Sequence, residues 1–409
     1  MRWVRARLDR IAPHFEHGGR LHKWHPLWEA VDTFFYSPAS VTGTAAHVRD
    51  AIDLKRIMMT VVIATLPCVL MAIFNTGLQA NLAIDPSRTA GLEGWRHDII
   101  RWLGTGYSPR SAVANLVHGG LYFLPLYVVT MVVGLGWEVL FAIVRKVEVN
   151  EGFFVTGILF PLILPPTTPL WQAALGISFG VVIAKEVFGG TGMNFINPAL
   201  AARAFLFFAY PGEISGDKVW TAVPEGAAVD GFSGATLLGQ MRVMTQPFEA
   251  AGFSWFRAFF GFEPGSMGET SAFACLIGAV IIGVTKVGSW RIMVGGVLGT
   301  IAMALVFNAI GSHTNPWYAV PFWWHMVLGG WAFGMAFMAT DPVTAPFAEK
   351  GKWVYGFMIG ALIVLIRVVN PAYPESTMLV ILFMNVVAPF IDWSFVKANV
   401  TRRRRRAAA

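Results

Sequence analysis

Two stretches of this sequence, GILFPLILPPTTP at residues 157–169 and GMAFMATDPVTAP at residues 334–346, decide the predicted fold because they repeat one pattern. Each places prolines at the end of an apolar run, and each is followed by a further apolar span. Each span then leads to an Asn-Pro-Ala triplet, at 197–199 and at 370–372. Matched interruptions of this kind are typical of membrane proteins built from two related halves with broken helices. Proline and asparagine also mark ordinary helix ends, so a pair of proline-rich loops is the alternative.

The composition indicates an integral membrane protein. Of the 409 residues, 55% are hydrophobic and only 13% are charged, which lies outside the usual composition of soluble globular domains. Much of the formal net charge of +7 resides in a basic tail that includes Lys397 and Arg402 to Arg406. Such a tail usually marks the cytoplasmic side of a membrane, and we do not expect it to bind nucleic acid.

About ten segments are apolar enough to cross a bilayer, which takes about 20 helical residues. The longer segments are 57–75, 117–144, 172–188, 271–286, 290–311, 320–340, 353–370 and 377–396, and two shorter or interrupted ones are 152–165 and 198–212. Because ten is even, both termini are expected on one side. The predicted fold class is an all-α polytopic membrane protein with about ten transmembrane helices in two five-helix halves.

The distribution of charge predicts how these segments are oriented. Short connections rich in Lys and Arg lie on the cytoplasmic side, and those at 145–146, 286–291 and 350–352 share that side with the basic tail. The 211–270 loop falls on the opposite, periplasmic side and carries seven acidic against three basic residues. The two copies of the repeat therefore lie on opposite faces, and the two halves are predicted to be inverted.

These boundaries divide the chain into five predicted regions. They are a cytoplasmic N-terminal arm at 1–56, a first five-helix half at 57–212, a periplasmic loop at 213–269, a second five-helix half at 270–396 and a basic cytoplasmic tail at 397–409.

The two cysteines, Cys68 and Cys275, lie in separate apolar runs with no CxxC motif or Cys/His cluster. Iron–sulfur clusters and structural zinc need such ligand sets. We therefore predict no tightly bound metal, and any redox cofactor is expected to be organic.

The periplasmic loop contains DGFSGAT at residues 230–236, a run of small and polar residues. These residue types usually form turns, and an ordinary flexible turn is the alternative interpretation. The run resembles the covalent flavin attachment site of the membrane flavoproteins in sodium-pumping NADH:quinone oxidoreductases and related Rnf complexes. In that motif the last hydroxyl is esterified to the phosphate of FMN, which implies a flavin on Thr236. The other matching residues are Asp230, Ser233, Gly234 and Ala235.

Thr236 needs help to react, because a threonine hydroxyl is a weak nucleophile at its own pKa. No activating base or metal-binding group is visible beside it in the sequence. An external flavin transferase is therefore implied.

Three further runs extend the resemblance over nearly the whole chain. They are VNEGFFVTG from Val149, KEVFGGTGMNFINPALAARAFLFFAYP from Lys185 and MATDPVTAPF from Met338. Together they resemble the B subunits of sodium-translocating NADH:ubiquinone oxidoreductases. The resemblance implies a six-subunit complex of the bacterial inner membrane, in which this subunit carries covalent FMN, holds riboflavin and provides the ubiquinone site.

The same resemblance implies roles for residues in the spans. Gly134 and Gly136 fall where the family places glycines near the quinone, and close helix packing is the alternative. Glu138, Asp341 and Asp392 match acids implicated in sodium uptake, in keeping with the general rule that intramembrane carboxylates mark ion paths. Glu138 and Asp392 could also be ordinary residues at the level of the lipid headgroups.

Polar residues in and near the first Asn-Pro-Ala triplet have two possible roles each. Asn194 and Asn197 are implied to contact a non-covalent riboflavin, and helix capping is the alternative. Arg203 and Lys185 could each pair with Glu186 or contact a flavin.

The resemblance implies that electrons pass from FMN on Thr236 at the outer face to riboflavin near the inner face and then to ubiquinone, coupled to sodium translocation. The chain has no dinucleotide-binding signature, so partner subunits are expected to oxidise NADH, and no residue is predicted to be catalytic by itself. One alternative is a D-type subunit of an Rnf ferredoxin:NAD oxidoreductase, which the N-terminal arm argues against. A flavin-free solute channel or carrier is the other, because inverted repeats also build transporters.

Overall fold

The computed structural model describes residues 54–408 apart from 148, 150–151, 225, 242–251, 371–372 and 374, together with 10–15, 18–21, 24–25, 28 and 32. The predicted N-terminal arm at 1–56 therefore lies mostly outside the described residues. The regular structure of the described part is helical, and its one β-type pairing is an isolated bridge between Ile84 and Ala228. The predicted all-α class is confirmed.

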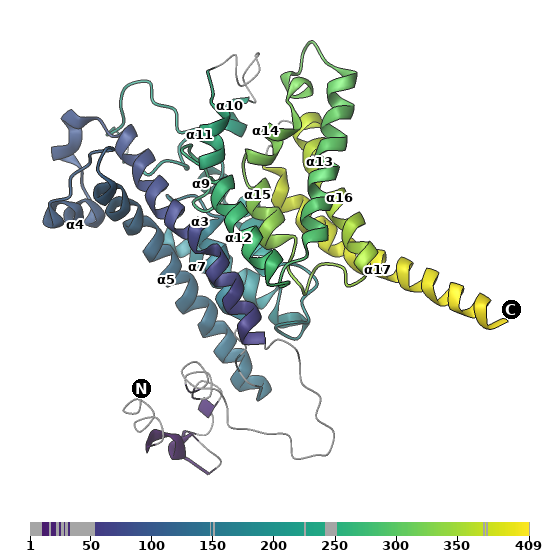
Figure 1. Ribbon diagram of the computed structural model, residues 1–409. Helices are drawn as coiled ribbons and strands as arrows, with labels where there is room; N and C mark the ends of the chain where they lie inside the picture. The colour runs from purple at the N-terminus through teal and green to yellow at the C-terminus, as the bar shows by residue number, and fades with distance from the viewer. Residues whose placement is uncertain are drawn as a thin grey trace.

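Six of the described helices are long and apolar enough to cross a membrane. They are α3 (Leu54–Ala83), α5 (Ala112–Arg145), α7 (Leu170–Val182, continued by a 3-10 turn to Phe188), α13 (Trp290–Ile310), α16 (Glu349–Val369) and α17 (Ser376–Ala408). Three shorter apolar helices, α6 (Gly152–Leu162), α8 (Pro198–Ala209) and α12 (Ala272–Val284), lie among them. This set is that of a polytopic membrane protein (Figure 1).

One predicted span is not a continuous helix. Residues 320–340 form α14 (Phe322–Val327), α15 (Trp331–Phe333) and a π-helical turn, Gly334–Met338. The helix stops where Gly329 takes a φ of +58°, and a Cβ there would lie 2.4 Å from the side chain of Leu238. The segment was predicted to be a span because it is apolar, and an apolar composition does not distinguish a long helix from a buried, broken one.

The helix contacts repeat in the two halves. In the first half α5 packs against α7, and α7 packs against α8. In the second half α13 packs against α16, and α16 packs against α17 in the same order along the chain. The halves meet where α3 packs against α12 (Figure 1) and where α8 touches α17. The repeat identified in the sequence therefore corresponds to a repeated packing arrangement.

Small residues allow the closest of these contacts. A Cβ on Gly299, Gly356 or Gly360 would lie 2.0–2.2 Å from a backbone oxygen of the facing helix, so α13 and α16 approach as only glycines permit. Where α3 meets α12, the Sγ atoms of Cys68 and Cys275 lie 3.8 Å apart and both thiols are free. Nothing in the sequence indicates that these two cysteines are neighbours.

In each half the chain leaves the helical conformation at the proline-rich copy of the repeat. After α6, the carbonyls of Leu162 and Leu164 accept hydrogen bonds from the amides of Gly268 (2.7 Å) and Met267 (3.2 Å). After the π-turn, the amides of Phe347 and Ala348 donate to the carboxylate of Asp392, both at 2.8 Å. Backbone groups at membrane depth need such internal partners, and both breaks supply them.

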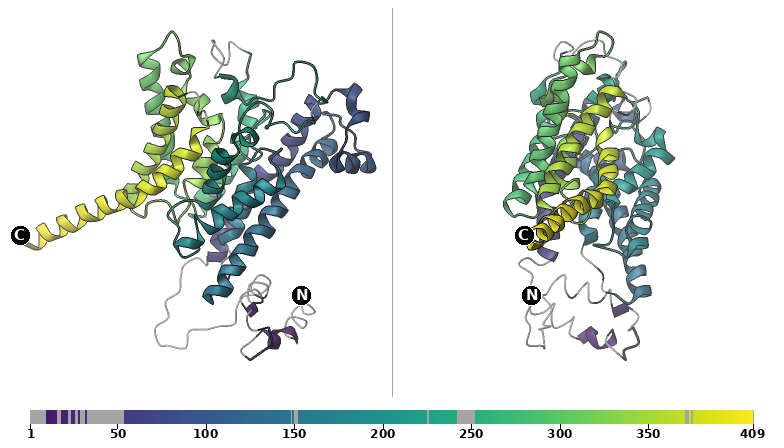
Figure 2. Two further views of the ribbon diagram at one scale, coloured as in Figure 1. Left: turned by 180° about the vertical axis from the view of Figure 1, so that it is seen from behind. Right: turned by 90° about the vertical axis from the view of Figure 1, so that its right-hand side faces the viewer.

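The two breaks lie toward opposite ends of the bundle. The first contacts the 213–269 region, which contains α10 (Leu237–Met241) and α11 (Trp255–Phe260) and lies at the upper end in Figure 1. The second lies near Ile57 at the beginning of α3, which is at the lower end. Opposite placement is what an inverted pair of halves requires. Beyond Asp392, α17 continues through the predicted basic tail to Ala408 and projects away from the bundle (Figure 2).

Candidate functional site

The 230–236 loop has a backbone that requires its glycines. Gly231 has a φ of +77°, a conformation that favours glycine. A Cβ on Gly234 would lie 2.6 Å from the carbonyl oxygen of Asp217, so a larger residue would displace the loop. The exposed side chain of Asp230 accepts a hydrogen bond from Arg88 at 3.1 Å. The loop therefore has a defined backbone conformation, and Arg88 bonds it to the connection that follows α3.

Thr236 ends this loop and immediately precedes α10. Its Oγ1 accepts a hydrogen bond from the amide of Gly239 at 3.1 Å, and Ser233 Oγ accepts a longer one from the amide of Ala235 at 3.4 Å. Ala235 is buried, whereas Thr236 is half-buried and lines a cavity. The hydroxyl is therefore fixed in position at the edge of an open site.

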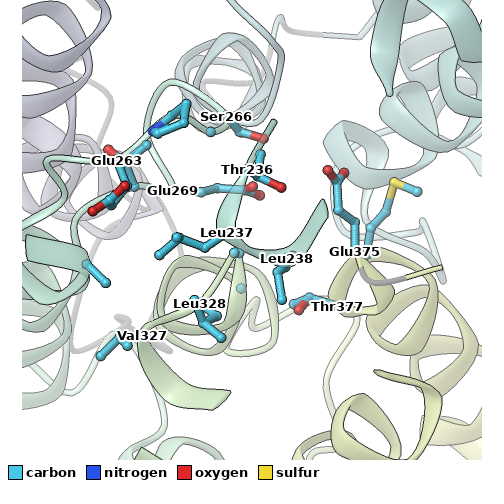
Figure 3. Close-up of a pocket in the computed structure, with 18 of the residues that line it drawn as sticks. Thr236, Leu237, Leu238, Glu263, Ser266, Glu269, Val327, Leu328, Glu375 and Thr377 are labelled. Carbon is cyan, nitrogen blue, oxygen red and sulfur yellow. The ribbon is translucent and has the colours of Figure 1, made fainter. Parts of the chain in front are cut away.

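We call this site the Thr236 cavity (Figure 3). Its enclosed part holds about 60 Å³. Much of its wall is apolar, with contributions from Leu200, Leu237, Leu238, Val327, Leu328, Met338, Met378 and Ile381. A compact set of charged and hydroxyl groups completes it, formed by Arg203, Glu263, Ser266, Glu269, Thr270, Glu375 and Thr377. Apolar walls around a few convergent polar groups are typical of cofactor sites.

Arg203 organises the charged part of the Thr236 cavity. Its guanidinium donates to Glu269 Oε1 at 2.8 Å, to Glu375 Oε2 at 3.0 Å and to Ser266 Oγ at 3.1 Å. The arginine belongs to α8 of the first half, and its side chain is only 5% exposed. Glu269 lies just before α12, and Glu375 directly precedes α17. The network therefore joins the two halves at the rim of the cavity.

The structure excludes one of the two roles that the sequence left open for Arg203 and Lys185. Neither Arg203 nor Lys185 pairs with Glu186, which accepts a hydrogen bond from Arg145 at 2.8 Å instead. Sequence reasoning also missed Glu269 and Glu375 as site residues. A signal existed, because an arginine in an apolar run needs a carboxylate partner, and both acids stand directly before apolar spans.

A second cavity lies toward the opposite end of the bundle, and we call it the Asp341 cavity. Its enclosed part holds about 70 Å³. Asn194, Asn197 and Lys185 from the first half line it together with Asp341 from the second. The residues predicted for riboflavin and one residue predicted for sodium therefore share one cavity.

The side chains of the Asp341 cavity are already partly engaged. Asn197 Oδ1 caps α8 by accepting from the amides of Ala199 (3.0 Å) and Leu200 (3.2 Å), so the capping alternative is confirmed for this residue. Asn194 donates to the carbonyl of Ile196 at 3.0 Å. Asp341 accepts from the amide of Val343 and the hydroxyl of Thr344, each at 3.1 Å. Capping does not preclude a second contact with a ligand.

The other two predicted acids have protein partners. Glu138 of α5 is buried and forms an ion pair with the buried ammonium of Lys185, which also lines the Asp341 cavity. Asp392 accepts the two amides that precede α16 and does not line that cavity. Glu138 is therefore buried inside the protein and paired with a basic residue.

The two glycines predicted near the quinone have different surroundings. Gly134 is buried, and a Cβ there would lie 2.0 Å from Cζ of Phe153 in α6. Gly136 is exposed, and a Cβ there would meet nothing within 4 Å. Close packing accounts for Gly134, whereas Gly136 leaves an open place on the outer surface of α5.

Substituting alanine at these two positions should separate packing from other roles. We expect Gly134→Ala to destabilise the fold by about 1–3 kcal/mol, because the new methyl group overlaps a buried ring. Gly136→Ala should change stability by less than about 0.5 kcal/mol and is the matched control. Thermal unfolding of the two variants in detergent measures this. Equal stability of both would mean that Phe153 does not pack on Gly134 as described.

Comparison with known proteins places the chain among named relatives. The model of the NQR2, RnfD, RnfE family matches residues 41–401. A protein of Ectopseudomonas mendocina, named as the B subunit of Na(+)-translocating NADH-quinone reductase, is 56% identical over 408 residues, or 98% of each chain. Proteins of the same name from Chromohalobacter salexigens (55% identical over 99% of this chain and 97% of theirs) and Azotobacter vinelandii (56% over 98% of each) are similarly close.

Proposed function

Because the chain belongs to the NQR2, RnfD and RnfE family, we propose that it is the B subunit of a Na⁺-translocating NADH-quinone reductase. The names of its relatives, each more than half identical over nearly the full length, support this assignment over an Rnf-type subunit. As one component of an enzyme complex of the bacterial inner membrane, it acts with partner subunits, ubiquinone, sodium ions and membrane lipid. The proposed topology has both termini in the cytoplasm and the Thr236 loop in the periplasm.

The observation that carries the proposed role is the position of Thr236. Its hydroxyl is fixed at the edge of a cavity that has apolar walls and a charged rim, and we propose that FMN is attached there through its phosphate. FMN when bound supplies one- and two-electron redox chemistry. The enclosed 60 Å³ has room for water molecules but not for a three-ring flavin. The ring would therefore lie at the mouth of the cavity, beside the half-buried Thr236.

We place the proposed riboflavin at the Asp341 cavity, where Asn194 and Asn197 come together. Because Asn197 Oδ1 is committed to capping α8, its amide nitrogen is the group that would donate to a ligand. The two cavities lie toward opposite ends of the bundle, which suits transfer of electrons from the outer to the inner side of the membrane. Ubiquinone is proposed to bind near the open surface at Gly136, beside Gly134.

Sodium binding is best supported at Asp341. Hard cations prefer oxygen ligands, and the break beside Asp341 leaves carboxylate and backbone oxygens next to a cavity, as in transporters with broken helices. Glu138 would bind sodium only after Lys185 withdraws, and Asp392 only after releasing the amides of Phe347 and Ala348. These two acids are therefore proposed to act in other steps of the sodium path.

In-gel flavin fluorescence tests the attachment site. Denaturation removes non-covalent flavin, so we expect a fluorescent band for the full chain purified from its native host and complete loss in Thr236→Val. Thr221→Val is the matched control, because Thr221 lies close to Gly234 and loses an equivalent hydroxyl. Its band should stay bright. A dark band for the unaltered protein would favour the flavin-free carrier, and a bright band for Thr236→Val would move the flavin to another residue.

A further inference from the structure

The rim of the Thr236 cavity contains more negative than positive charge. One guanidinium, that of Arg203, serves two carboxylates, Glu269 at 2.8 Å and Glu375 at 3.0 Å. A buried ion pair is tolerated when charges and hydrogen bonds are matched. Here one guanidinium neutralises the charge of only one carboxylate, so the second carboxylate leaves a net negative charge.

The surroundings offer little to balance that excess. Arg367 of α16 is fully buried, but its guanidinium donates to the carbonyls of His325 (2.7 Å) and Leu328 (2.9 Å) and acts on the two acids only from a distance. Glu263, a third acid on the wall, lies beside Arg257 at 3.7 Å. Among the uncharged polar groups of the cavity wall, Thr377 of α17 and Thr236 before α10 contribute only hydroxyls.

Glu375 is a carboxylate whose burial favours the protonated form. Burial raises its pKa to about 7 with a further contribution from Glu269, while Arg203 and Arg367 act in the opposite direction. Burial also raises the pKa of Glu263, which nearby Arg257 opposes. Glu375 thus titrates in the physiological range, inside the cavity that Thr236 lines.

We propose that Glu375 binds one proton when the flavin attached to Thr236 gains an electron. The electron comes from the donor subunits of the reductase, and the proton comes from water at the periplasmic mouth. The carboxylate becomes a carboxylic acid as the flavin becomes more negative, so the charge of the cavity does not change. On reoxidation the electron leaves for the next acceptor and the proton returns to water. This inference rests on the proposed attachment of FMN.

Proton binding by Glu375 makes reduction of the flavin depend on pH, and the direction of that dependence can be worked out. Below pH 7 Glu375 already carries its proton, so reduction binds none. Above pH 7 the acid is ionised while the flavin is oxidised, and the added electron raises its pKa, so reduction binds a proton. In that window each pH unit lowers the equilibrium constant for one-electron reduction tenfold, equal to about 59 mV.

Potentiometric titration of the full chain at a series of pH values tests this. The reduction potential of the flavin should fall with pH above pH 7 in the unaltered chain. We expect Glu375→Gln to lose the part of this slope that Glu375 provides. Glu269→Gln is the matched variant, because it keeps Glu375 but removes the acid that raises its pKa. Its slope should persist and begin at a lower pH. Protons taken up by the flavin ring itself are common to all three proteins.

Redox-difference infrared spectroscopy provides a second readout. Above pH 7, reduction should produce the carbonyl stretch of a protonated carboxylic acid, and this band should be absent in Glu375→Gln. An unchanged slope and infrared band in Glu375→Gln, with flavin still attached, would overturn the inference while leaving the flavin site intact. Absence of covalent flavin from the unaltered chain would instead overturn the proposed function and the inference with it.

Discussion

Replacing Arg203 by methionine is expected to destabilise the protein by about 3–5 kcal/mol, the usual cost of removing one partner from a buried ion pair. Glu269 and Glu375 would lose their shared guanidinium, and α8 would lose one of its polar links to the second half. Part of the cost would be relieved by protonation of the acids, so the loss should be smaller at low pH. Thermal unfolding in detergent at two pH values measures both effects.

Arg257→Met is the control for this prediction. Arg257 is 61% exposed and 3.7 Å from its acid, so the change should cost no more than about 1 kcal/mol. The triple variant Arg203→Met, Glu269→Gln, Glu375→Gln should recover much of the stability, because no buried charge is left without a partner. Equal, small losses for both single arginine variants would show that Arg203 is not buried between the two acids.

Replacing Lys185 by methionine is expected to have a similarly large effect, again about 3–5 kcal/mol. Both Lys185 and Glu138 are nearly inaccessible, with side chains 3% and 4% exposed, and each is the other's ion-pair partner. Loss of the ammonium leaves Glu138 without a counter-charge inside the protein. Thermal unfolding should show a large decrease in melting temperature.

The double variant Lys185→Met, Glu138→Gln distinguishes pairing from packing. It should be far more stable than Lys185→Met alone, because a neutral amide needs no counter-charge. Lys352→Met is the control, since its partner Glu349 is 57% exposed and the pair should contribute less than about 1 kcal/mol. A double variant as unstable as the single one would mean that the aliphatic part of Lys185, and not its charge, supports the fold.

The helices that correspond to long runs of apolar residues were predictable from the sequence. The nine apolar helices of the described residues all fall within or overlap predicted segments, and the two proline-rich breaks lie where the repeat placed them. The prediction failed at 320–340 because Gly329 has a positive φ, at a place where Leu238 from a distant part of the chain leaves no room for a Cβ. Hydrophobicity contains no information about such a contact.

The candidate sites were predictable only in part. The 230–236 motif is local, so Thr236 and its glycines could be identified from the sequence alone. The convergence of Asn197 and Asp341 in one cavity depends on how the two halves pack, and the sequence suggested separate roles for them. The pairing of Arg203 with Glu269 and Glu375 likewise joins residues 66 and 172 positions apart.

The central claim, a flavin on Thr236, is tested most directly by mass spectrometry of the native protein. Trypsin should release the peptide 219–242, which lies between Lys218 and Arg242 and also contains Thr221 and Ser233. We predict that its mass exceeds that of the unmodified peptide by one FMN less one water, with fragmentation placing the addition on Thr236. An unmodified peptide, or an addition on Thr221 or Ser233, would contradict the account.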